Sequence, residues 1–92
     1  MPEVRFHVRW PDGSGRACYS PSTVIHDFLT AGEAMPIAEF VAKVRAGLEA
    51  ASNRVEERYG RPCSIAAREI AEIERVARHQ VPDGAVTIET IG

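Results

Sequence analysis

The stretch "VRFHVRWPDGSG", residues 4–15, decides the fold because polar and apolar residues alternate strictly before a turn sequence. Four apolar side chains share one face of the strand that this pattern predicts: Val4, Phe6, Val8 and Trp10. Three basic side chains share the other face: Arg5, His7 and Arg9. A period of two indicates a half-buried β-strand over residues 3–10, so we expect a sheet with one face packed on a core.

The turn residues 11–15, "PDGSG", predict a tight reversal and a short antiparallel strand over residues 16–20. The length of the loop decides which side chain of this strand joins Phe6. A loop of two or four residues places Tyr19 there, and a loop of three residues places Cys18 there. We expect Tyr19 to point inward, because burial stabilises an aromatic ring more than a thiol.

The next segment predicts a short helix over residues 21–29. Ser20 can cap it, Pro21 suits a first helical position, and apolar residues recur at one-turn spacing before Gly32: Val24, Ile25, Phe28 and Leu29. A strand is the competing interpretation, because "TVIHDFL" is rich in β-branched and aromatic residues.

A long helix is predicted from Pro36 to Tyr59, where Gly60 is a natural stop and Pro62 prevents continuation. Its apolar stripe comprises Ile37, Phe40, Val41, Val44, Leu48, Ala51, Val55 and Tyr59. Ser64 can cap a second helix that reaches about His79. The apolar stripe of this helix comprises Ile65, Ala66, Ile70, Ile73 and Ala77. The short joint predicts an antiparallel helix pair.

A last strand is predicted over residues 85–91, "AVTIETI", which gives the order β-β-α-α-α-β. If the helix pair returns the chain to its starting end, this strand runs parallel to the first. We therefore expect a single α+β domain over residues 1–92, with a three-stranded mixed sheet in the order 2-1-3. The antiparallel helix pair should cover the Phe6 face, and the Arg5 face should stay open.

The composition excludes several classes of protein. The formal charge of −2 over 92 residues argues against nucleic-acid binding, for which only the first strand offers a basic patch. No apolar run approaches the roughly 18 residues of a membrane span, and "MPEVRF" lacks the pattern of a signal peptide. We expect a cytoplasmic protein with no membrane contact, in which Cys18 and Cys63 are free thiols.

Three segments carry a resemblance: "MPEVRFHVRWPDG" (1–13), "CYSPSTVIHDF" (18–28) and "YGRPCS" (59–64). In these segments the chain resembles a family of small bacterial nitrogen-starvation response proteins, and the likeness extends over nearly the whole length. Genes of that family typically lie near a gene for a nitrilase-type hydrolase. The resemblance implies a cytoplasmic role in nitrogen metabolism, and it assigns neither a reaction nor a site residue.

The basic strand face is the first candidate site. Successive side chains on one face of a strand are about 7 Å apart, so Arg5, His7 and Arg9 suit two phosphates or carboxylates better than one. The simpler interpretation is a solvated outer face of the sheet, partly neutralised by Glu89 from the neighbouring strand.

Cys63 is the second candidate, because helix-terminal amides beside it can favour a reactive thiolate. A nucleophile also needs a base, and no spacing selects among the three histidines of the chain: His7, His26 and His79. An inert cysteine is the simpler interpretation. A metal site would recruit Cys18, His26, Cys63 and His79 from four separate places, so we expect neither a metal nor a cofactor.

The second helix is rich in acid, and Glu69, Glu72 and Glu74 are most simply solvated, although they could meet a basic partner. The leading hypothesis for function is a non-catalytic interaction or regulatory module that binds a partner protein, or itself, through the open sheet face or an edge strand. The alternative is a small-molecule-binding or enzyme subunit, with Arg5 and Arg9 holding an anion and Cys63 or His7 reacting. Nucleic-acid binding through the basic strand is the weaker alternative.

Overall fold

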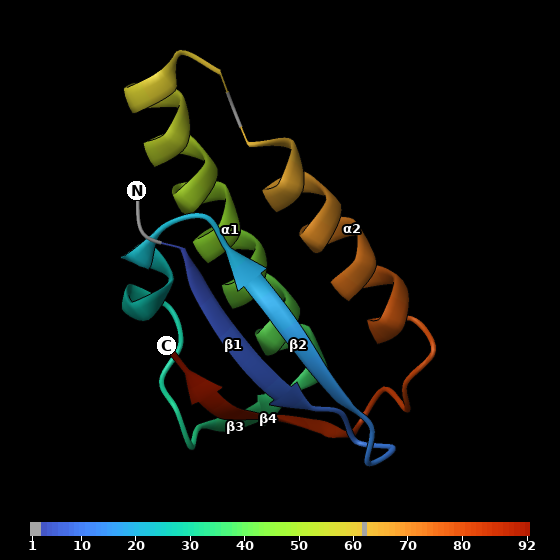
Figure 1. Cartoon of the computed structure of the whole chain (residues 1–92). Coiled ribbons are helices and arrows are strands. Elements are labelled where there is room, and N and C mark those ends of the chain that lie inside the picture. The colour runs from blue at the N-terminus through green and yellow to red at the C-terminus, as the bar shows by residue number, and fades with distance from the viewer. Residues whose placement is uncertain (1–2, 62) are drawn as a thin grey trace.

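The computed structural model describes residues 3–61 and 63–92, and it places a helical layer on one face of a sheet (Figure 1). In chain order the elements are β1 (Val4–Arg9), β2 (Gly15–Ser20), the 3₁₀ helix η1 (Thr23–Asp27), β3 (Ala34–Pro36), α1 (Ile37–Tyr59), α2 (Ser64–Ala77) and β4 (Ala85–Ile91). The α+β class is as predicted, and so are the two long helices and the last strand.

The sheet has four strands in the order β2-β1-β4-β3, and each pair of neighbours is antiparallel. The prediction that β1 lies between its hairpin partner and the last strand is confirmed. The predicted strand number was wrong, because β3 adds a fourth strand at the edge. The mixed sheet was also wrong, because β4 runs antiparallel to β1.

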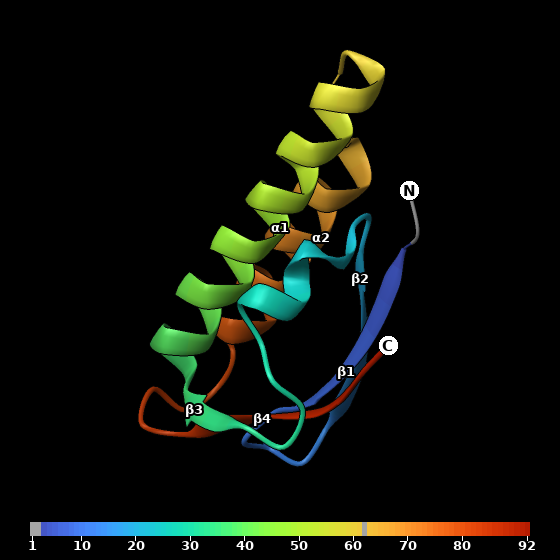
Figure 2. The same ribbon diagram turned by 90° about the vertical axis from the view of Figure 1, so that its left-hand side faces the viewer.

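The path of the chain before α1 explains the reversed direction of β4. Ser20 pairs with Val4 at one end of β1, whereas Thr87 pairs with both Ala34 and Arg9 at the other end. Residues 21–33 therefore carry the chain along the sheet before α1 begins, as Figure 2 shows. The prediction started the helix pair at the end where β2 finishes, so it reversed the last strand.

The hairpin register places Cys18, and not Tyr19, on the inner face. Phe6 is the partner of Cys18, and Arg5 is the partner of Tyr19. The backbone N–H of Trp10 donates to the carbonyl of Ser14 at 2.8 Å, which leaves residues 11–13 as a three-residue loop. The preference for a buried ring was wrong because the turn fixes the parity of the strand.

The five-residue 3₁₀ helix η1 replaces the helix predicted over residues 21–29, and the competing strand does not form. Its cap is Ser22, whose Oγ accepts from the N–H of Val24 at 3.3 Å, rather than Ser20. A Cβ built on Gly47 would lie 2.6 Å from Cδ1 of Ile25. The helix η1 therefore packs directly against α1, at a position that leaves no room for a side chain.

The helix α1 ends at Tyr59 as predicted, with Gly60 in the left-handed region at φ 83°. It begins at Ile37 rather than at Pro36, because Pro36 has an extended backbone and is the last residue of β3. Pro62, the expected barrier to continuation, lies outside the described residues. Over its 23 residues α1 extends about 34 Å, whereas the six residues of β1 extend about 20 Å. The last turns of α1 therefore project beyond the sheet, and Tyr59 is 58% exposed rather than part of the core.

The second helix α2 ends at Ala77, two residues before His79. The predicted cap by Ser64 was wrong, because Cys63 occupies the cap position and provides no side-chain hydrogen bond. Ile65 was predicted to lie on the apolar stripe but is 52% exposed, because it too lies at the projecting end of the helix pair.

The core lies between the helices and the inner face of the sheet. Trp10 and Phe40 meet edge to face there, with ring centroids 5.5 Å apart. The principal buried side chains are Val4, Phe6, Val8, Trp10, Ile25, Leu29, Phe40, Val44, Leu48, Ile73, Val86 and Ile88. The predicted cover of the Phe6 face by the helices is therefore observed.

Candidate functional site

The side of the sheet that faces away from the helices is bare in the described part of the chain (Figure 2). We call it the outer face. The alternating registers of three strands place on it Arg5, His7, Arg9, Ala17, Tyr19, Thr87 and Glu89. The three basic residues therefore share one surface, and a tyrosine and a glutamate from neighbouring strands join them.

A β-bulge brings Glu89 to two of these basic residues. His7 pairs with Thr90 and Val8 pairs with Ile88, so Glu89 is the extra residue on β4. One of its carboxylate oxygens, Oε1, lies 2.7 Å from Nδ1 of His7. Arg9 donates to both carboxylate oxygens, through Nε at 3.2 Å and Nη2 at 3.2 Å. The hydrogen bonds from Arg9 and then His7 lower the pKa of Glu89.

Arg9 has a further partner, because its Nη1 donates to the carbonyl of Gly13 in the hairpin loop at 2.8 Å. His7 and Arg9 therefore both bind the carboxylate of Glu89, and Arg9 also binds the hairpin loop. An external anion at this position would compete with Glu89 for the same donors. The geometry thus does not leave all three basic side chains free for the two anions considered from the sequence.

Arg5 stands apart from that cluster. Its guanidinium carbon lies 5.8 Å from the centroid of the Tyr19 ring, within the range of a cation–π contact. Its ion pair with Glu3, at 3.7 Å, is long, and the Arg5 side chain is 72% exposed. Desolvation is the main cause that raises the pKa of Tyr19, followed by the charge of Glu3. Arg5 and Tyr19 therefore form the most available part of the outer face.

One structural contact was missed by the sequence analysis. Glu69 of α2 binds Arg16 through Oε1, with 3.0 Å to Nη2, and its Oε2 accepts from the backbone N–H of Tyr19 at 3.0 Å. This carboxylate therefore occupies the backbone N–H of Tyr19, on the edge of β2 that does not pair with β1. The inward position of Cys18 puts Arg16 on the same face, so the correct loop length would have indicated an inward arginine beside α2.

The family model for the nitrogen starvation-induced protein NitG matches residues 5–91. The chain belongs to the NitG family. No curated protein matches the chain, and no solved structure does. The resemblance stated from three short segments is therefore confirmed at the level of the family.

In this member of the NitG family, the two thiols lie in different surroundings. Burial raises the pKa of Cys18 to about 12, so its thiol stays protonated near neutral pH. Cys63 is half-buried at the start of α2, and its backbone N–H donates to Oγ of Ser52 at 3.0 Å. His7 is on the outer face of the sheet, so the fold does not unite the thiol of Cys63 with this candidate base.

The residues considered for a metal site stay apart. Within residues 3–61 and 63–92, no three side chains of His, Cys, Asp or Glu are grouped so as to hold a metal ion. Cys18 is buried beneath the sheet, whereas His26 lies on η1 and His79 follows α2. Among the described residues, no helix has both the length and the apolar character needed to cross a membrane.

Proposed function

We propose that this NitG-family chain is a cytoplasmic, non-catalytic interaction module of the nitrogen-starvation response, which binds a partner protein through the outer face. One observation carries the proposal. The inner face of the sheet is covered by the helices, whereas in the described part of the chain no element lies over the face that bears Arg5 and Tyr19.

The chemistry of the outer face favours a protein partner over a small anion. His7 and Arg9 already share the carboxylate of Glu89, so the cluster is largely neutralised from within. Arginine and tyrosine are enriched among the residues that dominate the energy of protein interfaces. The contact between Arg5 and Tyr19 therefore suits the centre of such an interface.

The face is a better candidate than either edge strand. On the β2 side, Glu69 occupies the backbone donor of Tyr19 that an added strand would need. On the other side, β3 has only three residues and ends at Pro36, which lacks a backbone donor. Both features oppose strand addition, and neither one obstructs the outer face.

The family resemblance supports one class of partner. The resemblance implies that genes of the family lie near a nitrilase-type hydrolase gene, and on that expectation we propose an enzyme of nitrogen metabolism as the partner. The module would act on such an enzyme by binding, since the proposal assigns no reacting group to the outer face.

A comparison of two charge-reversal variants tests the proposal. We would immobilise the wild-type protein, Arg5→Glu and Arg54→Glu, and identify what each retains from extracts of nitrogen-starved cells. Arg54 is an exposed arginine of α1 with no ion pair among the described residues, so it is a matched control. Circular dichroism would confirm that all three are folded.

The expected result is a protein retained by the wild type and by Arg54→Glu but lost with Arg5→Glu, because the reversed charge repels the acidic group that Arg5 meets. Equal retention by all three folded proteins would contradict the use of the outer face. Recovery of an anionic small molecule in place of a protein would instead support the ligand-binding alternative.

A further inference from the structure

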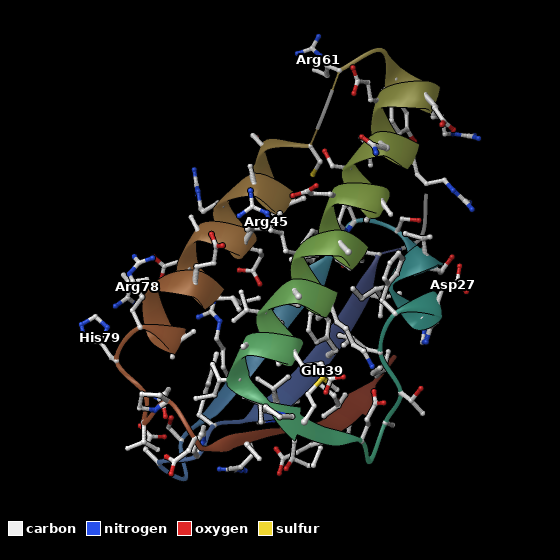
Figure 3. All side chains as sticks on the ribbon, turned by 180° about the vertical axis from the view of Figure 1, so that it is seen from behind. Asp27, Glu39, Arg45, Arg61, Arg78 and His79 are labelled. Carbon is white, nitrogen blue, oxygen red and sulfur yellow. The ribbon has the colours of Figure 1, made fainter. Side chains whose placement is uncertain are left out.

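The acidic side chains of α2 are engaged within the molecule. Glu69 binds Arg16 at 3.0 Å, and its side chain is only 16% exposed. Glu74 reaches across to Arg45 of α1 at 2.9 Å, and Figure 3 shows Arg45 between the two helices. Glu72 pairs with Arg75 on its own helix at 2.9 Å. The surface of α2 is therefore less acidic than its sequence suggests.

The arginines of α2 and of the joint before it have the opposite arrangement. Arg61, Arg68 and Arg78 are exposed, and none of them forms an ion pair within the described residues. Arg75 has only the exposed pair with Glu72, which is a weak type of contact. We call these four residues the arginine stripe: Arg61, Arg68, Arg75 and Arg78.

Helical spacing aligns three members of the stripe, Arg68, Arg75 and Arg78, along the solvent-exposed side of α2. Arg68 and Arg75 are seven residues apart and so share one face, and Arg78 follows Arg75 by a single turn. Figure 3 shows Arg61 at the joint that follows α1 and Arg78 at the far end of α2. A helix whose sequence is rich in glutamate therefore presents a basic surface to the solvent.

Apolar and small side chains accompany the stripe. Ile65 is 52% exposed and lies three residues before Arg68. Ala67 and Ala71 are exposed on the same side of α2, and their small size allows close approach by another helix. The surface therefore combines positive charge with an apolar contact, which is the combination found at protein interfaces.

From this arrangement we infer that the arginine stripe docks an acidic amphipathic helix of a partner protein. Carboxylates on such a helix complement the exposed guanidinium groups, and its apolar side chains complement Ile65. A phosphate backbone has no apolar group to match the exposed Ile65, so this contact favours a protein helix over a nucleic acid. This surface is separate from the outer face, because α2 packs on the opposite side of the sheet.

The experiment uses a defined acidic helix as the probe. A fluorescein-labelled peptide with three repeats of Glu-Leu-Ala-Ala-Leu-Glu-Ala would be titrated with the full chain, and anisotropy would report binding at low and high salt. The same peptide with Gln in place of Glu tests the role of charge. A labelled oligothymidylate of similar length tests nucleic acid.

The test variant is Arg68→Gln combined with Arg78→Gln, and the control is Arg54→Glu, which changes the net charge by the same amount. We expect the double variant to bind the acidic peptide at least about fivefold more weakly, because it loses two exposed ion pairs. The control should bind as the wild type does. Ile65→Ser should also weaken binding, and added salt should weaken it further.

Three results would overturn the inference: equal affinity of the double variant and the control, equal affinity for the Gln peptide, or tighter binding of the oligonucleotide than of the acidic peptide. Circular dichroism would confirm that each variant is folded. Because these substitutions leave Arg5 and Tyr19 intact, failure here would not affect the result of the Arg5→Glu comparison.

Discussion

Replacement of Glu69 by alanine should destabilise the fold more than any other removal of a charge from α2. The Glu69 side chain is 16% exposed and that of Arg16 is 25% exposed, so the pair is largely shielded from water. The Nε of Arg16 already lacks a hydrogen-bond partner in the described structure. Loss of the Glu69 carboxylate would also remove the negative charge that offsets the burial of the Arg16 guanidinium. It also leaves the N–H of Tyr19 without its acceptor.

The size of the effect follows from these two losses. Removing one partner of a fully buried ion pair costs about 3–5 kcal/mol, and the partial exposure here reduces that figure. A hydrogen bond to a charged group contributes about 1.5–3 kcal/mol. The two figures overlap, because they describe the same carboxylate. We therefore expect Glu69→Ala to lower the free energy of unfolding by about 2–4 kcal/mol, and Glu69→Gln by less, because the amide keeps an acceptor for Tyr19.

Urea denaturation followed by circular dichroism measures this change, and Glu72→Ala is the matched control on the same helix. The Glu72 side chain is 41% exposed in its pair with Arg75, so the control should lose much less stability than Glu69→Ala. A double-mutant cycle with Arg16→Met isolates the contribution of the pair. The reasoning is refuted if Glu69→Ala costs no more than Glu72→Ala.

Three further predictions concern the core, the thiols and acid stability. Phe40→Ala should lower the free energy of unfolding by about 3–5 kcal/mol, measured by urea denaturation with Trp10 fluorescence, because Phe40 is fully buried against the Trp10 ring. A decrease below about 1.5 kcal/mol would contradict this packing. Iodoacetamide should label Cys63 but not Cys18 in the folded protein near pH 8, since burial raises the pKa of Cys18 to about 12; equal labelling by mass spectrometry would disprove this. The pKa of Glu89 is lower in the folded state than its ordinary value of 4.5. The ionised carboxylate therefore stabilises the fold above pH 4.5, and this stabilisation is lost as the pH falls through the pKa of the folded state. Glu89→Gln should therefore show a smaller loss of stability than the wild type between about pH 5 and pH 3 in urea denaturation, and an unchanged loss would count against the cluster.

The parts of the fold that were predicted are those with a strong local period. Alternation over β1 and β4 and the one-turn spacing of α1 report burial directly, so their positions agree with the structure. The inward position of Cys18 depended on the length of one loop, which changes the parity of every later residue in β2. The strand β3 is too short to show a period, so the sequence did not indicate that the chain crosses to the other end of the sheet before α1, which reverses the last strand. Arg5, His7 and Arg9 were correctly placed on one face, and Glu89 was expected to neutralise part of that face. The bulge that brings Glu89 to His7 and Arg9 has no pattern in the sequence.

The position of β4 in the sheet bears on how the domain folds. The β1–β2 hairpin and the α1–α2 pair join neighbouring segments of the chain, so each requires the closure of only a short loop. The strand β4 instead inserts between β1 and β3, and its side-chain contact with Arg9 spans 80 residues. Such non-local pairing slows folding. Until β4 arrives, the edges of β1 and β3 are open to pairing with other chains, so the interval before its insertion is when this protein is most exposed to aggregation.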